Sequence, residues 1–283
     1  MTRKLIALVD GSVYSKTVCD HAIWIAGRTG MDVELMHVLG RRETGPGQDL
    51  SGSITLGARS ALLEQLAGID EQRARLAVQR GRAILEDAQS LLEQAGITAS
   101  EYLRHGDLIE AVSEKEGGAD LIVMGKRGEG ADFAKGHLGS NLERVMRATT
   151  RPLFVASRAF NPIEKVLVAF DGSANAIRAV EHVSRNPLYA GLPLEIVTVG
   201  PDSPAAKTAL ADVKSLLIKA GFETGARILP GQPEEVLGKL IETENFGHMV
   251  MGAAGNSRLR ALFVGSTALE MIRSCKVPIL LIR

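Results

Sequence analysis

The chain has 283 residues, of which 33 are Lys or Arg and 33 are Asp or Glu, and only two are cysteines. Its length allows two domains of roughly 140 residues that each bury a core. Because the charges balance, no net field would attract the protein to nucleic acid or to an anionic membrane, and we expect neither as a partner.

The N-terminus predicts no targeting or membrane segment. The apolar run from Leu5 stops after five residues, at Asp10, which is too short for the apolar core of a signal peptide. No later run approaches the roughly 18 apolar residues of a membrane span. Cys19 and Cys275 have no metal-ligand spacing, and the six histidines form no HxxxH or HExxH pair. We therefore expect a cytoplasmic protein with reduced thiols and no metal bound by its own side chains.

The first 40 residues predict a parallel strand–helix–strand unit. Lys4 to Val9 is a continuous apolar run, typical of a strand buried on both faces of a sheet, and Asp10-Gly11-Ser12 ends it. Apolar residues from Val18 to Ala26 follow at helical spacing. Val33 to Val38 then predicts the second strand. A helix between two strands indicates a parallel crossover rather than a hairpin.

The alternation continues to about residue 156. Gly40 to Gly57 is rich in Gly, Ser, Thr and Pro, which indicates a surface loop, and a long helix is expected from Ser60 to Gln94. The further elements expected are a strand at 98–103, a helix at 108–116, a strand at 119–124, a helix at 142–148 and a strand at 152–156.

The pattern then repeats. Lys165 to Ser173 aligns with Lys4 to Ser12 at a shift of 161, whereas Ala220-Gly221 matches Ala95-Gly96 at a shift of 125. The fall in the shift places about 36 extra residues in the first copy, within about residues 40–79. We therefore predict an α/β protein of two tandem, doubly wound, Rossmann-like domains, 1–158 and 159–283, each with a five-stranded parallel sheet.

The inserted segment leaves two interpretations open. Its Gly/Ser/Pro portion is either a mobile loop or a lid. The helical portion after Ser60 is either a surface for a protein partner or an elongated helix that covers the sheet. We favour the elongated helix.

Two loops in each copy follow buried strands and carry residues suited to a ligand. Asp10 and Asp171 stand directly after the first strand of each copy, and a glycine-rich loop after the fourth strand leads into a helix that begins near Ser140 or Ser266. Glycines let the backbone approach a ligand, and free N–H groups at a helix start favour phosphate. Ligands of open sheets bind beyond the carboxyl ends of strands where the strand order reverses. If strands one and four are adjacent, each aspartate faces the glycine loop of its own copy.

Simpler interpretations remain for these residues. The aspartates and the hydroxyls are also suitable as ordinary helix N-caps. Lys126 and Arg127 in the first loop either meet phosphates or are solvated, and the same choice applies to Arg258 and Arg260 in the second.

A strand that ends in Asp-Gly-Ser, followed later by Gly-x2-Gly-x9-Gly-Ser/Thr, resembles the universal stress protein family, whose nucleotide-binding members use these elements for ATP. The resemblance covers the chain twice, as in a tandem member. The second copy fits the spacing with Gly252, Gly255 and Gly265. The first copy departs from it, because ten residues rather than nine separate Gly128 from Gly139.

The resemblance implies the role of each residue. In the second copy Asp171 would approach the adenosine, Val199 would line the base pocket, and Met251 and Gly252 would flank the ribose. Gly255, Gly265, Ser266 and Thr267 would hold the phosphates. The implied counterparts in the first copy are Asp10, Val38, Met124, Gly125, Gly128, Gly139, Ser140 and Asn141. Plain core packing is the alternative for the two valines. The implied cofactor is ATP, ADP or AMP, with Mg²⁺ held mainly through the phosphates.

The resemblance also bears on assembly and activity. Domains of the family pair through their last strands, so 152–156 and 278–282 would pair within this chain as an internal pseudo-dimer, and a homodimer of whole chains stays open. Neither copy contains GxxxxGK[ST], and no catalytic set stands out, so we assign no catalytic residue and expect at most weak ATPase activity. The leading hypothesis is an ATP-binding stress sensor or regulator that acts on an unknown protein partner. The alternatives are a scaffold without nucleotide and an adenine-nucleotide α-hydrolase-type enzyme.

Overall fold

The computed structural model describes residues 3–40, 56–128, 138–253 and 265–283, with only the backbone at 56–64. The first half of the chain contains β1 (Lys4–Leu8), α1 (Val13–Thr29), β2 (Asp32–Leu39), α3 (Leu56–Gln94), β3 (Ala99–His105), α4 (Leu108–Glu116), β4 (Leu121–Gly125), α5 (Ser140–Ala148) and β5 (Leu153–Ala156). The second half contains β6 (Val166–Ala169), α6 (Ala174–Arg185), the short 3-10 helix η2 (Pro187–Tyr189), β7 (Leu194–Val199), α7 (Pro204–Lys219), β8 (Thr224–Leu229), α8 (Pro233–Thr243), β9 (His248–Gly252), α9 (Ser266–Ser274) and β10 (Ile279–Ile282). The alternation of strands and helices confirms the α/β class.

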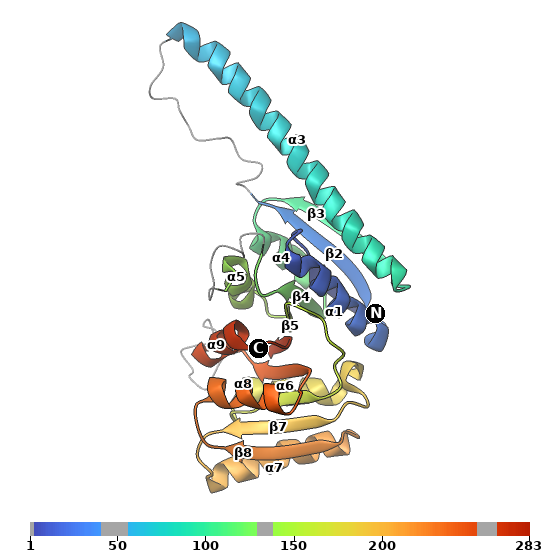
Figure 1. Cartoon of the computed structure of the whole chain (residues 1–283), viewed down its shortest axis with the longest axis vertical. Helices are drawn as coiled ribbons and strands as arrows, with labels where there is room; N and C mark the ends of the chain where they lie inside the picture. Colours follow the sequence, from blue (N-terminus) through green and yellow to red (C-terminus); the bar gives the residue numbers. More distant parts are fainter. Residues whose placement is uncertain (1–2, 41–55, 129–137, 254–264) are drawn as a thin grey trace.

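The strands of the described residues form one ten-stranded sheet in the order β3-β2-β1-β4-β5-β10-β9-β6-β7-β8 (Figure 1). Neighbouring strands are parallel within each half. At the centre, β5 and β10 pair antiparallel, with Phe154 opposite Leu280. The two last strands therefore pair within one chain, as expected, and each five-stranded sheet is half of a larger one.

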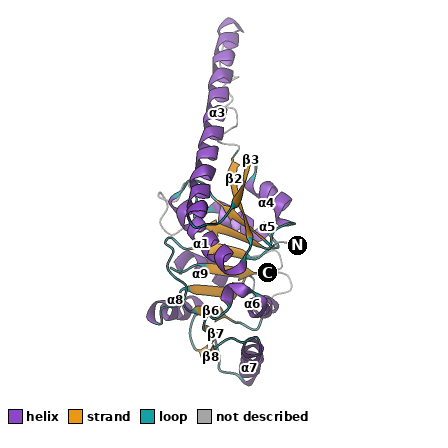
Figure 2. Ribbon diagram, turned by 90° about the vertical axis from the view of Figure 1, so that its right-hand side faces the viewer, coloured by secondary structure: helices purple, strands orange, loops and turns teal. Residues whose placement is uncertain are grey.

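Helices cover both faces of the sheet (Figure 2). Successive strand residues point to opposite faces, so Leu5 and Ala7 pack with α1, α3, α6 and α7, whereas Ile6 packs with α4, α5, α8 and α9. Each of these two cores contains residues from both halves of the chain. The halves thus share one continuous interior.

A serine caps the N-terminus of the first helix in each half. The Ser12 side chain accepts a hydrogen bond from the Tyr14 N–H and caps α1, and the Ser173 side chain accepts one from the Ala176 N–H and caps α6. Such side-chain caps satisfy N–H groups that a helix start leaves without a partner. No helix of the described residues is both long and apolar enough to cross a membrane.

The largest difference between the halves is α3, with 39 residues against 16 in α7. Its C-terminal turns pack Leu85, Ala88 and Leu92 onto the sheet beside β2 and β3. Residues 65–80 have no buried side chain, and this part of the helix extends beyond the sheet (Figures 1 and 2). The helix expected from Ser60 begins earlier, at Leu56. The expectation that it covers the sheet is right for its C-terminal turns and wrong for residues 65–80.

Candidate functional site

The strand order reverses at one point in each half of the sheet. From β1 the chain continues outward to β2 and β3 and then returns to β4, which pairs with β1 in register Ile6 to Ile122. In the second half β6 pairs with β9 in register Val168 to Val250. The adjacency of strands one and four is therefore confirmed. Loops that leave the carboxyl ends of these strands face the crevice in which doubly wound proteins bind ligands.

The two aspartates at these crevices are not helix caps, because serines cap α1 and α6. One oxygen of each aspartate instead closes a local turn. Asp10 Oδ1 accepts from the Ser12 N–H at 3.0 Å, and Asp171 Oδ1 accepts from the Ser173 N–H at 2.9 Å. This side-chain turn fixes the carboxylate at the strand end. The turn uses only Oδ1, so Oδ2 takes no part in it.

The helices that follow the glycine-rich loops begin without a side-chain cap. Gly139 and Gly265 occupy the cap positions of α5 and α9, and neither helix start has a side-chain cap hydrogen bond among the described residues. The Gly139 N–H donates to Lys126 O at 3.2 Å, and the Gly265 N–H donates to Ala253 O at 3.0 Å. These bonds hold the start of α5 beside the end of β4 and the start of α9 beside the end of β9. Uncapped N–H groups and the positive end of the helix dipole suit an anionic group.

In the second half these features surround one cavity of about 220 Å³. Asp171 lines one side, and Gly265, Ser266 and Thr267 line another. The predicted residues Val199, Met251 and Gly252 complete the wall, together with Phe170, Pro233 and Leu237. Gly255, Arg258 and Arg260 lie outside the described residues. The cavity thus joins a carboxylate, an uncapped helix start and an apolar wall.

In the first half the corresponding cavity is smaller, about 90 Å³. Seven predicted residues line it, namely Asp10, Val38, Met124, Gly125, Gly128, Gly139 and Asn141. Ser140, the eighth, is the exposed first residue of α5 and does not line the cavity. Tyr14 and Leu142 line the first cavity, where the second half has Asn175 and Ala268 in the sequence. The larger side chains account for the narrower space.

Three glycines beside the cavities have close neighbours. A Cβ at Gly125 would lie 2.7 Å from Tyr14 Cβ, and one at Gly252 would lie 2.9 Å from Ala176 N. A Cβ at Gly128 would lie 2.7 Å from Asp10 Oδ2. The first two glycines therefore let α1 and α6 pack closely on the strands, which is reason enough for glycine there. Gly128 brings its loop against the Asp10 carboxylate.

The interpretation of Lys126 as a phosphate ligand is wrong for this structure. Its side chain is buried, and Nζ donates a hydrogen bond to Cys275 O at the C-terminal end of α9. Burial lowers the pKa of this ammonium from its usual range, and the neighbouring Arg127 acts in the same direction. Arg127 lines the first cavity. Lys126 instead connects the first half to the second.

Sequence reasoning missed the contribution of the helices that follow the third strand of each half. Leu108, at the start of α4, lines the first cavity, and Pro233 and Leu237 of α8 line the second. The signal available was the repeat itself, since Leu108 and Pro233 align at the shift of 125.

In the described part of the chain, no group of three or more His, Cys, Asp or Glu side chains is placed to hold a metal ion.

The fold and the two cavities define a class: a doubly wound α/β protein with paired switch-point sites, each of which combines a carboxylate with an uncapped helix start. The model of the universal stress protein family matches residues 1–157 and 207–283. Universal stress protein Slr1230 of Synechocystis sp. is 35% identical over 286 residues, which cover 99% of this chain and 100% of the relative. The chain belongs to the universal stress protein family.

Solved structures agree on the fold. The crystal structure of a universal stress protein from Archaeoglobus fulgidus matches with a TM-score of 0.74 and 22% identity, covering 99% of this chain and 98% of its own. A universal stress protein in complex with cAMP matches 44% of this chain and 98% of its own, with 23% identity and a TM-score of 0.38. A match this partial transfers no ligand to this chain, so the assignment of a ligand depends on the cavities.

Proposed function

We propose that the protein binds an adenine nucleotide, ATP, ADP or AMP, chiefly in the second cavity, and acts in the cytoplasm as a stress-response sensor or regulator. Its occupancy would be passed to a protein partner, with slow or no hydrolysis. The observation that supports this most is that Asp171 and the uncapped start of α9 line the same cavity.

The chemistry of the lining selects for a nucleotide over a simple anion. The Asp171 carboxylate would repel a bare phosphate, but it accepts hydrogen bonds from ribose hydroxyls or from a base amino group. The N–H groups at Ser266 and Thr267 suit phosphate oxygens. Val199, Leu237 and Met251 offer an apolar wall to a base. Only a ligand with a polar sugar, a flat base and a phosphate uses all three parts.

The Mg²⁺ ion implied by the family resemblance fits this cavity if the phosphates of the nucleotide hold it. The described lining of the second cavity contains one carboxylate, that of Asp171. Mg²⁺ is commonly held by one or two carboxylates together with substrate phosphates and water. Mg²⁺ would therefore enter with the phosphates and neutralise their charge, while the side chains position the nucleotide.

The test begins with mass analysis of the small molecules released from freshly purified protein, followed by calorimetric titration with ATP, ADP and AMP. Asp171→Asn keeps the oxygen that closes the turn with Ser173 and removes the charge. We expect it to weaken nucleotide binding by about tenfold or more, as for loss of a charge-assisted hydrogen bond. Asp212→Asn, at an exposed position of α7, is the matched control and should leave the affinity unchanged.

Asp10→Asn reports on the first cavity separately. A small effect of Asp10→Asn beside a large effect of Asp171→Asn would support the second cavity as the main site. Equal affinities of the Asp171→Asn and Asp212→Asn proteins would reject the site assignment. Absence of any adenine-nucleotide binding would favour the scaffold alternative, and rapid release of AMP and pyrophosphate would favour the enzyme.

A further inference from the structure

A third cavity, of about 210 Å³, lies where the two halves of the chain meet. It is lined by the segment after β4, by the C-terminal end of α9 and by the residues after β5. The described lining contains five cationic side chains and no carboxylate: Lys126, Arg127, Arg158, Arg273 and Lys276. A cavity with this charge is unexpected in a chain whose total charge is balanced.

Acids of the described residues pair with only two of the five cations. Arg273 pairs with Glu270 at 2.8 Å and Lys276 with Glu242 at 2.8 Å. Both pairs are exposed, so water screens them and they hold their cations weakly. Within the described part of the chain, Arg127 and Arg158 make no hydrogen bond or ion pair. Among the described residues, these two guanidinium groups thus have no acid that pairs with them.

The fifth cation, Lys126, has a partner at the C-terminal end of α9. Lys126 is buried, and its Nζ donates to Cys275 O, so one carbonyl at the negative end of α9 has a cationic partner. The bond and the positive charge of Lys126 reduce the repulsion that this helix end exerts on an anion in the cavity. Residue 253, the counterpart of Lys126 in the second half, is an alanine. The counterpart position in the second half therefore contributes no cation, and the basic cavity combines Lys126 and Arg127 of the first half with Arg273 and Lys276 of the second.

The basic cavity adjoins the first nucleotide-site candidate. Tyr14 and Arg127 line both cavities. A chain of phosphates that extends from the first cavity into the basic cavity would meet Arg127, which lines both, and then Arg158 and Arg273, which line only the basic cavity. Guanidinium groups are well suited to phosphate oxygens, because their planar N–H donors match them in pairs.

We propose that this cavity at the junction of the halves binds an oligophosphate chain, either as a free inorganic ion or as the extended tail of a nucleotide held in the first cavity. The assignment does not depend on nucleotide binding in the second cavity. It gives the narrow first site a ligand chemistry of its own.

The experiment is calorimetric titration of the full chain with inorganic triphosphate at fixed ionic strength. The test variant combines Arg158→Gln and Arg273→Gln, two exposed residues whose loss should not affect folding. The control combines Lys219→Gln and Lys239→Gln, which remove the same charge from exposed positions on α7 and α8. We expect the test variant to lose about tenfold or more in affinity and the control to bind like the parent. Equal urea midpoints would show that both variants fold.

Two arms distinguish the source of the phosphates. If the bound phosphates are the tail of a nucleotide, the affinity of the protein rises from AMP through ATP to adenosine tetraphosphate, and inorganic triphosphate competes with adenosine tetraphosphate. If the ion is free, triphosphate binds AMP-saturated protein as tightly as empty protein. Either result supports the proposal. It is overturned if triphosphate does not bind, or if the test variant and the control bind it equally, whatever the outcome for Asp171→Asn.

Discussion

At the end of β9, Gly252 lies directly against the first turn of α6. A Cβ there would be 2.9 Å from Ala176 N and 3.0 Å from Asn175 C, and a helix backbone does not yield as a side-chain end does. We expect Gly252→Ala to lower the free energy of unfolding by about 1–3 kcal/mol, the usual cost of overpacking. Urea denaturation measures this. Gly238→Ala on α8 is the control, because its Cβ would meet nothing within 4 Å and should stabilise the helix by about 0.5–1 kcal/mol. A fully stable Gly252→Ala protein would refute the packing explanation.

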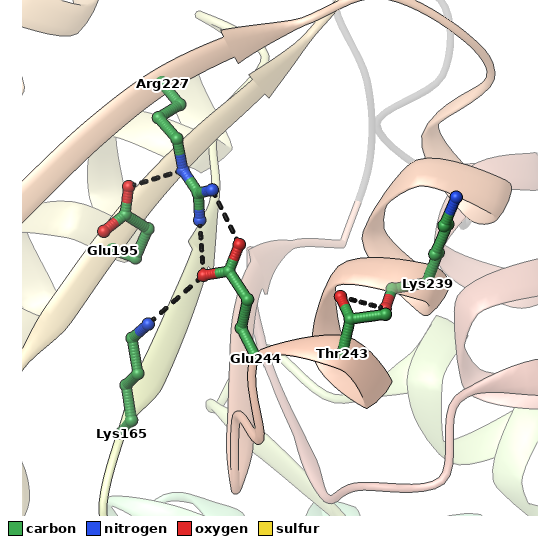
Figure 3. A network of polar contacts seen from close by, with 6 residues as sticks. All are labelled: Lys165, Glu195, Arg227, Lys239, Thr243 and Glu244. Atoms are coloured by element: carbon green, nitrogen blue, oxygen red, sulfur yellow. Dashed lines mark hydrogen bonds and ion pairs between the residues drawn. The ribbon is translucent and has the colours of Figure 1, made fainter.

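The ion pairs of two aligned glutamates show what the sequence repeat alone can predict. The Glu195 carboxylate accepts from Arg227 Nε at 2.8 Å, and the same guanidinium donates to both oxygens of Glu244 at 2.7 and 2.9 Å (Figure 3). This pairing lowers the pKa of Glu244. Glu34, which aligns with Glu195, pairs instead with two lysines at 3.4 Å. The two acids align at the shift of 161, but the alignment does not give their partners: Lys4 pairs with Glu34, whereas its counterpart Lys165 pairs with Glu244.

At the scale of elements, α3 offers two environments on one helix. Leu92 has no exposed surface, whereas Leu76 is 56% exposed. We expect Leu92→Ala to cost about 2–5 kcal/mol, since it removes buried methyl groups and leaves a cavity against the sheet. Leu76→Ala should change stability by no more than about 0.5 kcal/mol. Chemical denaturation of the two variants tests this. Equal losses would mean that the extended part of α3 is also covered by packing partners.

Local sequence predicted most of these elements, because apolar runs and helical spacing depend on neighbours along the chain. It also predicted that Asp171 and Ser266 share a crevice, on the condition that strands one and four are adjacent. Local sequence could not predict the width of either cavity. Tyr14 and Leu142 narrow the first cavity through contacts between α1, β4 and α5, and no periodicity reports such contacts. The projection of α3 was missed for the same reason, since burial of 65–80 depends on where the sheet ends.

At the scale of the whole molecule, each half of the chain caps a helix of the other. Arg283, after β10, donates to the carbonyls of Met146, Arg147 and Thr149 at the end of α5, at 2.8–3.2 Å. Lys126, after β4, donates to Cys275 O at the end of α9. Cations at helix C-termini are favourable, because the carbonyls there lack partners. Together with the β5–β10 pair, these contacts attach the two halves to each other at the junction.

Two buried histidines stand at this junction. The His248 ring stacks on Phe154 with centroids 5.1 Å apart, and the His21 ring lies 5.4 Å from Phe154. His21 Nδ1 is 2.6 Å from Thr17 O, and His248 Nδ1 is 2.9 Å from Pro278 O. A carbonyl only accepts, so Nδ1 carries the proton in both rings, and Nε2 is unprotonated in the neutral form. Burial lowers the pKa of His21 to about 4 and that of His248 to about 3.

These pKa values predict how stability depends on pH. In the unfolded chain both histidines take up a proton as the pH falls below about 6.5, whereas the folded chain does so only near pH 4 and pH 3. Between these pH values the unfolded state therefore binds more protons than the folded state, and the free energy of unfolding decreases as the pH decreases. Each histidine should lower the free energy of unfolding by about 2 kcal/mol when the pH is lowered from 7 to 5.

Urea denaturation at the two pH values measures the difference. The His21→Phe/His248→Phe double variant should have a smaller difference at whatever absolute stability it retains, while His105→Gln, at an exposed position, should match the parent. An unchanged difference in the double variant would mean that the junction histidines are not the groups that titrate.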